Sequence, residues 1–263
     1  MKYLVSIVFA VLVLGGVLAW TGLFPGEWGS RSDSETGEPE VHPVGPFPAR
    51  VPEADKTASI PSDAELPETL IQTVPFTPQA PSAQWSDPVF QNACEESSLI
   101  MAAAWAASET TLPPKAEIEQ EIRTISALAE KRFGEEAYDT SADDTAALYR
   151  EYFKSDNISV LHDLTLDDLR DAIREGNIVV APFDGRELGN PHYTPPGPIY
   201  HMLVIIGYDA DTREFVTNDP GTRLGASFRY AEGVLFDAIS DYPTGHHLPR
   251  TSAARKSAIV ISR

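Results

Sequence analysis

The sequence predicts an α+β fold in which helices come first along the folded part of the chain and strands follow. Between about residues 69 and 176, apolar side chains recur at helical spacing, and glycines stand where helices should end. From Ile178 onward, short and nearly continuous apolar runs are separated by turn-forming residues, which is typical of buried strands. This separation of helices from strands indicates an α+β rather than an alternating α/β domain.

The chain divides into three segments. Residues 1–24 contain an unbroken apolar or small stretch after Lys2, which predicts a signal peptide or an N-terminal membrane anchor. Residues 25–68 are rich in Pro, Gly, Ser, Asp and Glu, so we expect a disordered, extended linker. Residues 69–263 are within the size range of one domain. The folded domain is therefore expected to be exported, and either tethered to a membrane or secreted after cleavage.

The formal net charge of -19 argues against a nucleic-acid or anionic-lipid partner, because both require basic surfaces. We therefore expect membrane contact only through the N-terminal segment. We also expect the protein to be a monomer. Adjacent His246 and His247 have no cluster of further Cys or His ligands nearby, so we interpret them as part of a solvated loop. No metal and no organic cofactor is implied.

The first element expected in the domain is an edge strand, because Leu70 to Phe76 alternates apolar and polar residues before Pro78. A helix then begins near Cys94, where Asn92 and Glu95 have the spacing of a capping box. The run from Leu99 to Ala107 is apolar on every face, which predicts a helix buried at the centre of the domain.

Further helices are expected from apolar spacing and from capping residues. They are residues 115–133 ended by Gly134, a helix opened by Ser141 with Asp144, and a helix opened by Thr165 with Asp168 and ended by Gly176.

Strands are expected in the second half, joined by a Gly-, Pro- and Asn-rich loop and by a hairpin-like connection at 209–213. They are residues 178–183, 201–208, 214–218 and 258–261, with one more helix near residues 231–242.

Cys94, the one cysteine in the chain, lies in the first turn of the expected buried helix. The positive end of a helix dipole favours a thiolate, which is the nucleophilic form of cysteine. The alternative interpretation is a small buried apolar residue, since free cysteines are among the most often buried side chains.

Cys94, His201 and Asp219 follow one another in the order that suits nucleophilic acyl transfer, as nucleophile, base and orienting group. The hairpin after His201 brings the chain back, so His201 and Asp219 can be neighbours. Asn218 competes for the orienting position, and alternation along a strand allows only one of the two to face His201. We favour Asp219, because a carboxylate stabilises the imidazolium that pairs with a thiolate.

An acyl-transfer site also needs donors for the developing oxyanion. The backbone N–H of Cys94 is one candidate, and Gln79, Gln84 and Gln91 are side-chain candidates. Gln79 is preferred, because Gln91 lies too near Cys94 in the chain to reach over it.

The ordered set of these motifs resembles the papain-like cysteine peptidases related to the bacteriocin-processing, double-glycine leader peptidases. The residues that carry the resemblance are Val74-Pro75-Phe76-Thr77-Pro78-Gln79, Trp85, Cys94 with Ser97 or Ser98 and Met101, the run from His201 to Asp209, and Asn218-Asp219-Pro220-Gly221. The resemblance implies a papain-like fold, in which an N-terminal helical lobe with a central cysteine-bearing helix packs on an antiparallel sheet lobe. It also implies that Cys94 is the nucleophile, His201 the base, Asp219 its orienter and Gln79 the oxyanion-hole residue.

The sequence departs from this family after the cysteine, where Glu95 and Glu96 replace the usual glycine and small residue. Two carboxylates beside a thiol raise its pKa and disfavour attack. From the ordered set of motifs we nevertheless expect an exported thiol hydrolase that cleaves peptide bonds through a Cys94 acyl-enzyme, and because of the two glutamates we keep two alternatives. One is a cell-wall endopeptidase or transpeptidase of the papain-like NlpC type, and the other is a catalytically inactive papain-shaped binding module.

Overall fold

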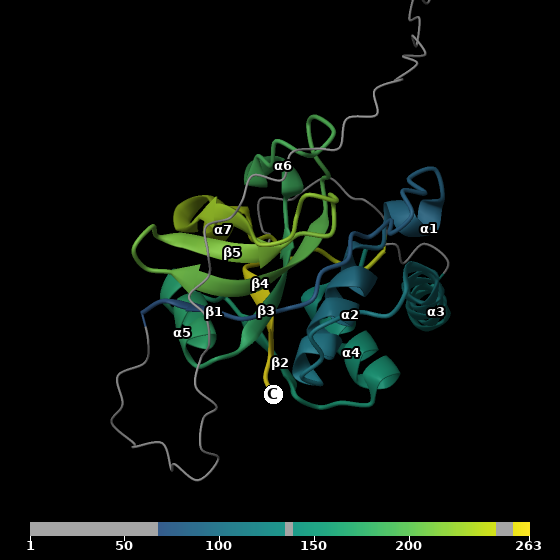
Figure 1. Ribbon diagram of the computed structural model, residues 1–263, viewed down its shortest axis with the longest axis horizontal. Helices are drawn as coiled ribbons and strands as arrows, with labels where there is room; N and C mark the ends of the chain where they lie inside the picture. The colour runs from purple at the N-terminus through teal and green to yellow at the C-terminus, as the bar shows by residue number, and fades with distance from the viewer. Residues whose placement is uncertain (1–67, 135–138, 246–254) are drawn as a thin grey trace, which may run out of the picture. The chain divides into compact units, whose positions relative to one another are not determined.

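The computed structural model of the chain describes residues 68–134, 139–245 and 255–263 (Figure 1). The predicted signal or anchor at residues 1–24, nearly all of the 25–68 linker, and His246 and His247 lie outside these ranges. Within them, no helix is both long enough and apolar enough to cross a membrane.

The described chain contains short and long helices that flank one antiparallel sheet. The helices are α1 (Pro88–Gln91), α2 (Cys94–Ala106), α3 (Lys115–Phe133), α4 (Ala142–Phe153), α5 (Leu166–Arg174), α6 (Gly185–Leu188) and α7 (Glu232–Ala238). The strands are β1 (Leu70–Ile71), β2 (Ile158–His162), β3 (Ile178–Phe183), β4 (His201–Asp209), β5 (Glu214–Asn218), β6 (Phe228–Ala231) and β7 (Ser257–Ile261).

The sheet has the strand order β2-β7-β3-β4-β5-β6, with β1 added against β4, and every neighbouring pair is antiparallel. Helices α1 to α4 precede most of the strands, so the predicted α+β class is confirmed. The short elements α1, α6, β2 and β6 were not predicted, because they are brief and, in β2 and β6, only partly buried.

Side-chain alternation along the central strands gives the sheet two apolar faces. On β3, Ile178 and Val180 pack with α2 and α4, whereas Val179 and Ala181 pack with α5 and α7. Figure 1 shows α2, α3 and α4 together on one side of the sheet. The sheet is therefore covered on both faces, and α2 is held in the interior, as its uniformly apolar sequence predicted.

Helix ends test the local predictions. Gly134 follows α3 with a φ of 110°, a conformation that L side chains rarely adopt. Thr165 and Asp168 form the predicted capping box of α5. The capping box predicted for Asn92 and Glu95 is wrong, because α2 begins at Cys94 without a side-chain cap. The reason is that Asn92 ends α1 and donates to the carbonyl of Pro88, while Glu95 turns into the interior.

The edge strand predicted over Leu70 to Phe76 is only two residues long in the structure. It lies so close to β4 that a Cβ on Gly207 would come within 2.6 Å of the Ile71 Cα. The backbone N–H of Gln72 still bonds to the carbonyl of Ile206 at 2.7 Å, but pairing stops before Pro75, which has no N–H to donate.

Candidate active site

Cys94 is the first residue of α2, which crosses the centre of the domain. Leu99, Met101 and Trp105 on this helix are fully buried, so the helix start is firmly held. The Cys94 side chain is 4% exposed. It nevertheless lines a cleft of about 520 Å³ that His201 and Gln79 also line.

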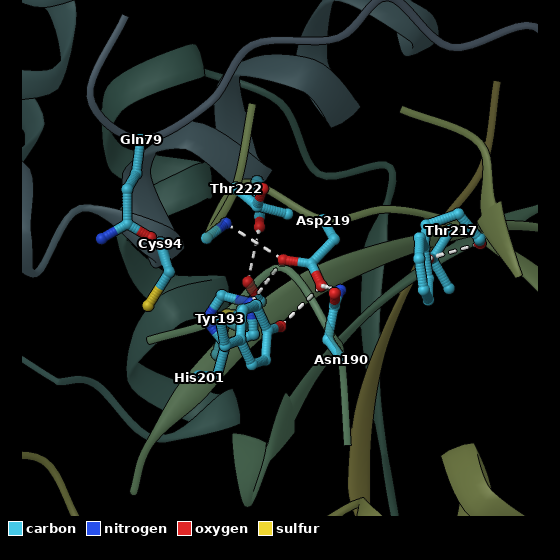
Figure 2. A network of polar contacts seen from close by, with 12 residues as sticks. Gln79, Cys94, Asn190, Tyr193, His201, Thr217, Asp219 and Thr222 are labelled. Atoms are coloured by element: carbon cyan, nitrogen blue, oxygen red, sulfur yellow. Dashed lines mark hydrogen bonds and ion pairs between the residues drawn. The ribbon is translucent and has the colours of Figure 1, made fainter. Parts of the chain in front are cut away.

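His201 and Asp219 are brought together by the β4–β5 hairpin, as predicted from the chain order. His201 begins β4, Asp219 directly follows β5, and the His201 Nε2 lies 2.8 Å from the Asp219 Oδ1. Because Nε2 is hydrogen-bonded to Asp219, Nδ1 is the ring nitrogen that can accept a proton from the thiol. Figure 2 shows Cys94, Gln79 and His201 grouped on one side of the Asp219 carboxylate.

Asn218 points away from His201, since successive side chains on a strand alternate. Its Nδ2 donates to the carbonyl of Val74 at 3.0 Å, and its Oδ1 accepts from the N–H of Ser227 at 3.1 Å. Between the two candidates for the orienting position, Asp219 is therefore the one that contacts the histidine.

Asp219 is fully buried at the centre of a hydrogen-bond network that sequence reasoning missed (Figure 2). Besides His201, the donors to its carboxylate are the Tyr193 hydroxyl at 2.5 Å, the Tyr230 hydroxyl at 2.8 Å, the Gly221 N–H at 3.0 Å and the Asn190 Nδ2 at 3.1 Å. Burial by itself raises the pKa of Asp219, but the interaction with His201 and the donated hydrogen bonds lower that pKa below its ordinary value. The network thus keeps the carboxylate ionised.

Two glycines allow the chain to close around this carboxylate. The N–H of Asp219 donates to the carbonyl of Gly225, and a Cβ at Gly225 would lie 1.9 Å from the Asp219 carbonyl oxygen. A Cβ at Gly221 would lie 2.8 Å from the His201 Cε1. A larger residue at either position would displace His201 or Asp219 from their contact with each other.

The Cys94 thiol has an acidic neighbour. Its Sγ lies 3.0 Å from the Oε2 of Glu95, whose other oxygen accepts from the Tyr242 hydroxyl at 2.9 Å and from the Thr140 N–H at 3.3 Å. Burial and the charge of Glu95 raise the pKa of Cys94 well above its ordinary value, and a hydrogen bond from the Met202 backbone offsets this only in part. The resting cysteine is therefore a neutral thiol, contrary to what the helix dipole alone predicted.

Glu96 and Asp139 extend this acidic cluster, which we define as Glu95, Glu96 and Asp139. Burial raises the pKa of all three carboxyl groups, and the charge of Glu95 adds to the rise for the other two. The pKa of Asp139 reaches about 8. A protonated carboxyl group in this cluster avoids the cost of burying several like charges together.

We expect this cluster to make the folded domain less stable as pH rises. The pKa of Asp139 is about 8 in the folded state and near the ordinary 3.8 in the unfolded state. Its contribution to stability is therefore complete below about pH 4 and is lost as pH rises through 8. Urea unfolding should show a fall in the free energy of unfolding between pH 5 and pH 8.5, and Asp139→Asn should make that fall smaller. Equal pH slopes for the two proteins would contradict the prediction.

Gln79 lies at the cleft beside Cys94, where the sequence placed an oxyanion donor. Its Nε2 donates to the carbonyl of Gln91 at 2.8 Å and to that of Phe90 at 3.1 Å. Both amide protons are thus in use, and one must leave its carbonyl before the side chain can bind an oxyanion. The Cys94 N–H, at the first helical position, has no intrahelical acceptor.

The walls of the cleft come from two loops. The segment from Tyr193 to Tyr200, part of the expected Gly-, Pro- and Asn-rich loop, lines one side, and Trp85, which is 40% exposed, lines another. Among the residues that the structure describes, no group of three or more His, Cys, Asp or Glu side chains is arranged to hold a metal ion.

Comparison with known proteins gives the family. The model of the Peptidase_C39 like family matches residues 71–235. Among solved structures, a crystal structure described as a C39-like peptidase from Bacillus anthracis aligns with a TM-score of 0.45 and 15% identity, over 74% of this chain and 98% of that chain. No curated protein matches the sequence. The papain-like α+β fold expected from the sequence agrees with the family found here. Because the family model spans more than half of the chain and includes Cys94, His201 and Asp219, this protein belongs to the C39-like family of cysteine peptidases.

Proposed function

We propose that the chain is a peptidase that cleaves peptide bonds through an acyl-enzyme on Cys94, with His201 as base and acid and Asp219 as its orienting group. The observation that carries the proposal is the 2.8 Å contact between His201 Nε2 and Asp219 Oδ1, at the edge of the cleft that Cys94 lines. A buried carboxylate on Nε2 fixes the ring orientation and favours the imidazolium.

The reaction begins when His201 Nδ1 takes the thiol proton and Sγ attacks the scissile carbonyl carbon. The carbonyl oxygen becomes an oxyanion, for which the Cys94 N–H and a released Gln79 amide are the donors. The tetrahedral adduct collapses, the C–N bond breaks, and His201 gives its proton to the leaving amine. Water, deprotonated by His201, then attacks the thioester, and the proton returns to Sγ as the acid product leaves.

The Cys94 thiol must break its hydrogen bond to Glu95 before His201 can accept its proton. Rotation about the Cα–Cβ bond of Cys94 moves Sγ between neighbours, since each staggered rotamer points it in a different direction. Because burial and the charge of Glu95 raise the pKa of the thiol, we infer that its proton moves to His201 as Sγ attacks the substrate.

A second candidate function is a catalytically inactive binding module. The contact between Cys94 Sγ and Glu95 favours it, because it holds the sulfur as a thiol. Such a module would use the same cleft to hold a peptide without cleaving it.

Alkylation and peptide cleavage distinguish the two functions. The full chain should cleave members of a peptide library, detected as new termini by mass spectrometry, and Cys94→Ala should cleave none. Iodoacetamide should label Cys94 in the wild type faster than in His201→Ala. His162→Ala is the matched control, since His162 lies on β2, outside the cleft lining. An intact library, with labelling unaffected by His201→Ala, would favour the binding module.

We also propose that the domain is exported, as a monomer, and meets the membrane only through residues 1–24. The apolar run that begins at Tyr3 and the net charge of -19 support this proposal. Fractionation of cells that express the full chain, followed by N-terminal sequencing, would test export and cleavage together. Recovery in the cytoplasm with Met1 intact would contradict it.

A further inference from the structure

We infer that the substrate cleft continues past the reactive residues into a second, basic hollow, and that this hollow selects peptides with an acidic side chain near the scissile bond. This inference rests on the proposed function and names the class of its substrate. We define the basic hollow by its charged or titratable lining residues, Lys115, His192 and Arg223.

The basic hollow is directly connected to the cleft. It measures about 710 Å³, and Trp85, Thr194 and Gly221 line both it and the cleft around Cys94. Gly221 stands at the junction, where a Cβ would lie 2.8 Å from the His201 Cε1 and 3.1 Å from the Tyr193 Cε1. The absence of a side chain there keeps the space next to His201 open, so a peptide held at Cys94 can extend into the hollow.

The charge of the hollow is opposite to that of the chain as a whole. The chain carries a formal charge of -19, yet no Asp or Glu among the described residues lines the hollow. Within the described ranges, neither Lys115 nor Arg223 forms an ion pair. The carboxylate of Glu119 lies nearby, where it accepts a hydrogen bond from Ser82 and feels the charge of Lys115. Two exposed cations against one carboxylate leave the hollow positive.

The position of Lys115 adds to this character. Lys115 is the first residue of α3, a helix of 19 residues, and the positive end of a helix disfavours a cation there. A carboxylate in the hollow would interact favourably with both the ammonium group and the helix end. Glu117 lies in the same first turn, so the helix end adds only part of its charge to the site.

Among the described residues, no Lys or Arg lines the cleft around Cys94. Asp139 lines the cleft but not the basic hollow, and Glu95 lies behind Cys94. An acidic side chain of a substrate is thus attracted toward Lys115 and Arg223 in the basic hollow rather than toward the cleft around Cys94. This asymmetry fixes the direction in which a peptide with one acidic residue lies across Cys94.

Cleavage of position-scanned peptides by the full chain tests the inference. At one position beside the scissile bond, Asp or Glu should raise kcat/KM about threefold to tenfold over Ala, mainly through KM, and Lys should lower it. The double variant Lys115→Glu with Arg223→Glu should reverse this order. Lys131→Glu, at the other end of α3, is the matched control and should keep it. Cleavage without an acidic preference, or with one that the double variant retains, would overturn the inference and leave the peptidase proposal intact.

A binding measurement separates this inference from the chemistry. Fluorescein-labelled peptides should bind the Cys94→Ala chain more tightly when they carry Asp at the selected position, by a similar factor, and 0.5 M NaCl should weaken that advantage. If no peptide is cleaved but this preference is present, the peptidase proposal fails and the basic hollow stands as a binding site. Equal binding of Asp and Lys peptides would overturn the inference that the basic hollow selects acidic side chains.

Discussion

Replacing Asp219 by alanine is expected to reduce kcat/KM by about 10³- to 10⁴-fold, because His201 then loses the group that fixes its ring and stabilises its charge. The same change should lower the free energy of unfolding by about 3–5 kcal/mol. Asp219 is fully buried, and its removal leaves the hydroxyl groups of Tyr193 and Tyr230 without their carboxylate acceptor. Activity assays and urea unfolding of the same preparations measure both effects.

Two further variants separate chemistry from stability. Asp219→Asn keeps the shape and an acceptor oxygen but removes the charge, so it should lose most of the activity and less of the stability. Asp209→Ala removes a carboxylate from the other end of the same hairpin, where it pairs with the partly exposed Arg229. That control should cost no more than about 1 kcal/mol and leave activity unchanged. Full activity in Asp219→Ala would contradict the proposal that Asp219 orients His201.

Replacing Glu95 by glutamine is expected to make Cys94 more reactive. The negative charge of Glu95 raises the pKa of the thiol, so its removal lowers that pKa and increases the thiolate fraction at neutral pH. Each unit of pKa corresponds to about a tenfold change in thiolate below the pKa. The rate of alkylation by iodoacetamide at pH 7 should therefore rise, and its pH profile should move to lower pH.

Glu96→Gln is the matched control for this experiment. Glu96 is the next residue on α2 and is also buried, but Cys94 Sγ bonds to Glu95 rather than to it. Its replacement should change the alkylation rate much less. A slower reaction in Glu95→Gln would mean that Glu95 accepts the thiol proton during the reaction, and would assign it a part of the base function proposed for His201.

Much of the scaffold could be predicted because it depends on local patterns. The uniformly apolar run that starts at Leu99 implied a buried helix, and the strands at 178–183 and 201–208 followed from continuous apolar residues. The capping box of Thr165 and Asp168 formed as expected, because its bonds join residues three positions apart. The pairing of His201 with Asp219 was also accessible, since one hairpin is enough to join them.

The contacts that set the protonation of the site residues could not be predicted from the sequence in the same way. Asn92 and Glu95 have capping-box spacing, yet Glu95 turns inward to Tyr242 and Thr140, which are distant in sequence. The network around Asp219 likewise draws Asn190, Tyr193 and Tyr230 from separate segments. No local pattern marks such residues, because each becomes a partner only when the sheet is assembled.

The sequence by itself determined the α+β class, the buried helix that starts at Cys94 and the order of Cys94, His201 and Asp219 along the chain, because short-range spacing and side-chain polarity encode these features. The tertiary structure alone decided that Glu95 contacts the thiol and that a basic hollow adjoins the cleft, and it agrees with the preference for Asp219 over Asn218 as the contact of His201. Those features depend on which distant segments meet and on how much water they exclude, and burial and neighbouring charge then set the protonation of each group.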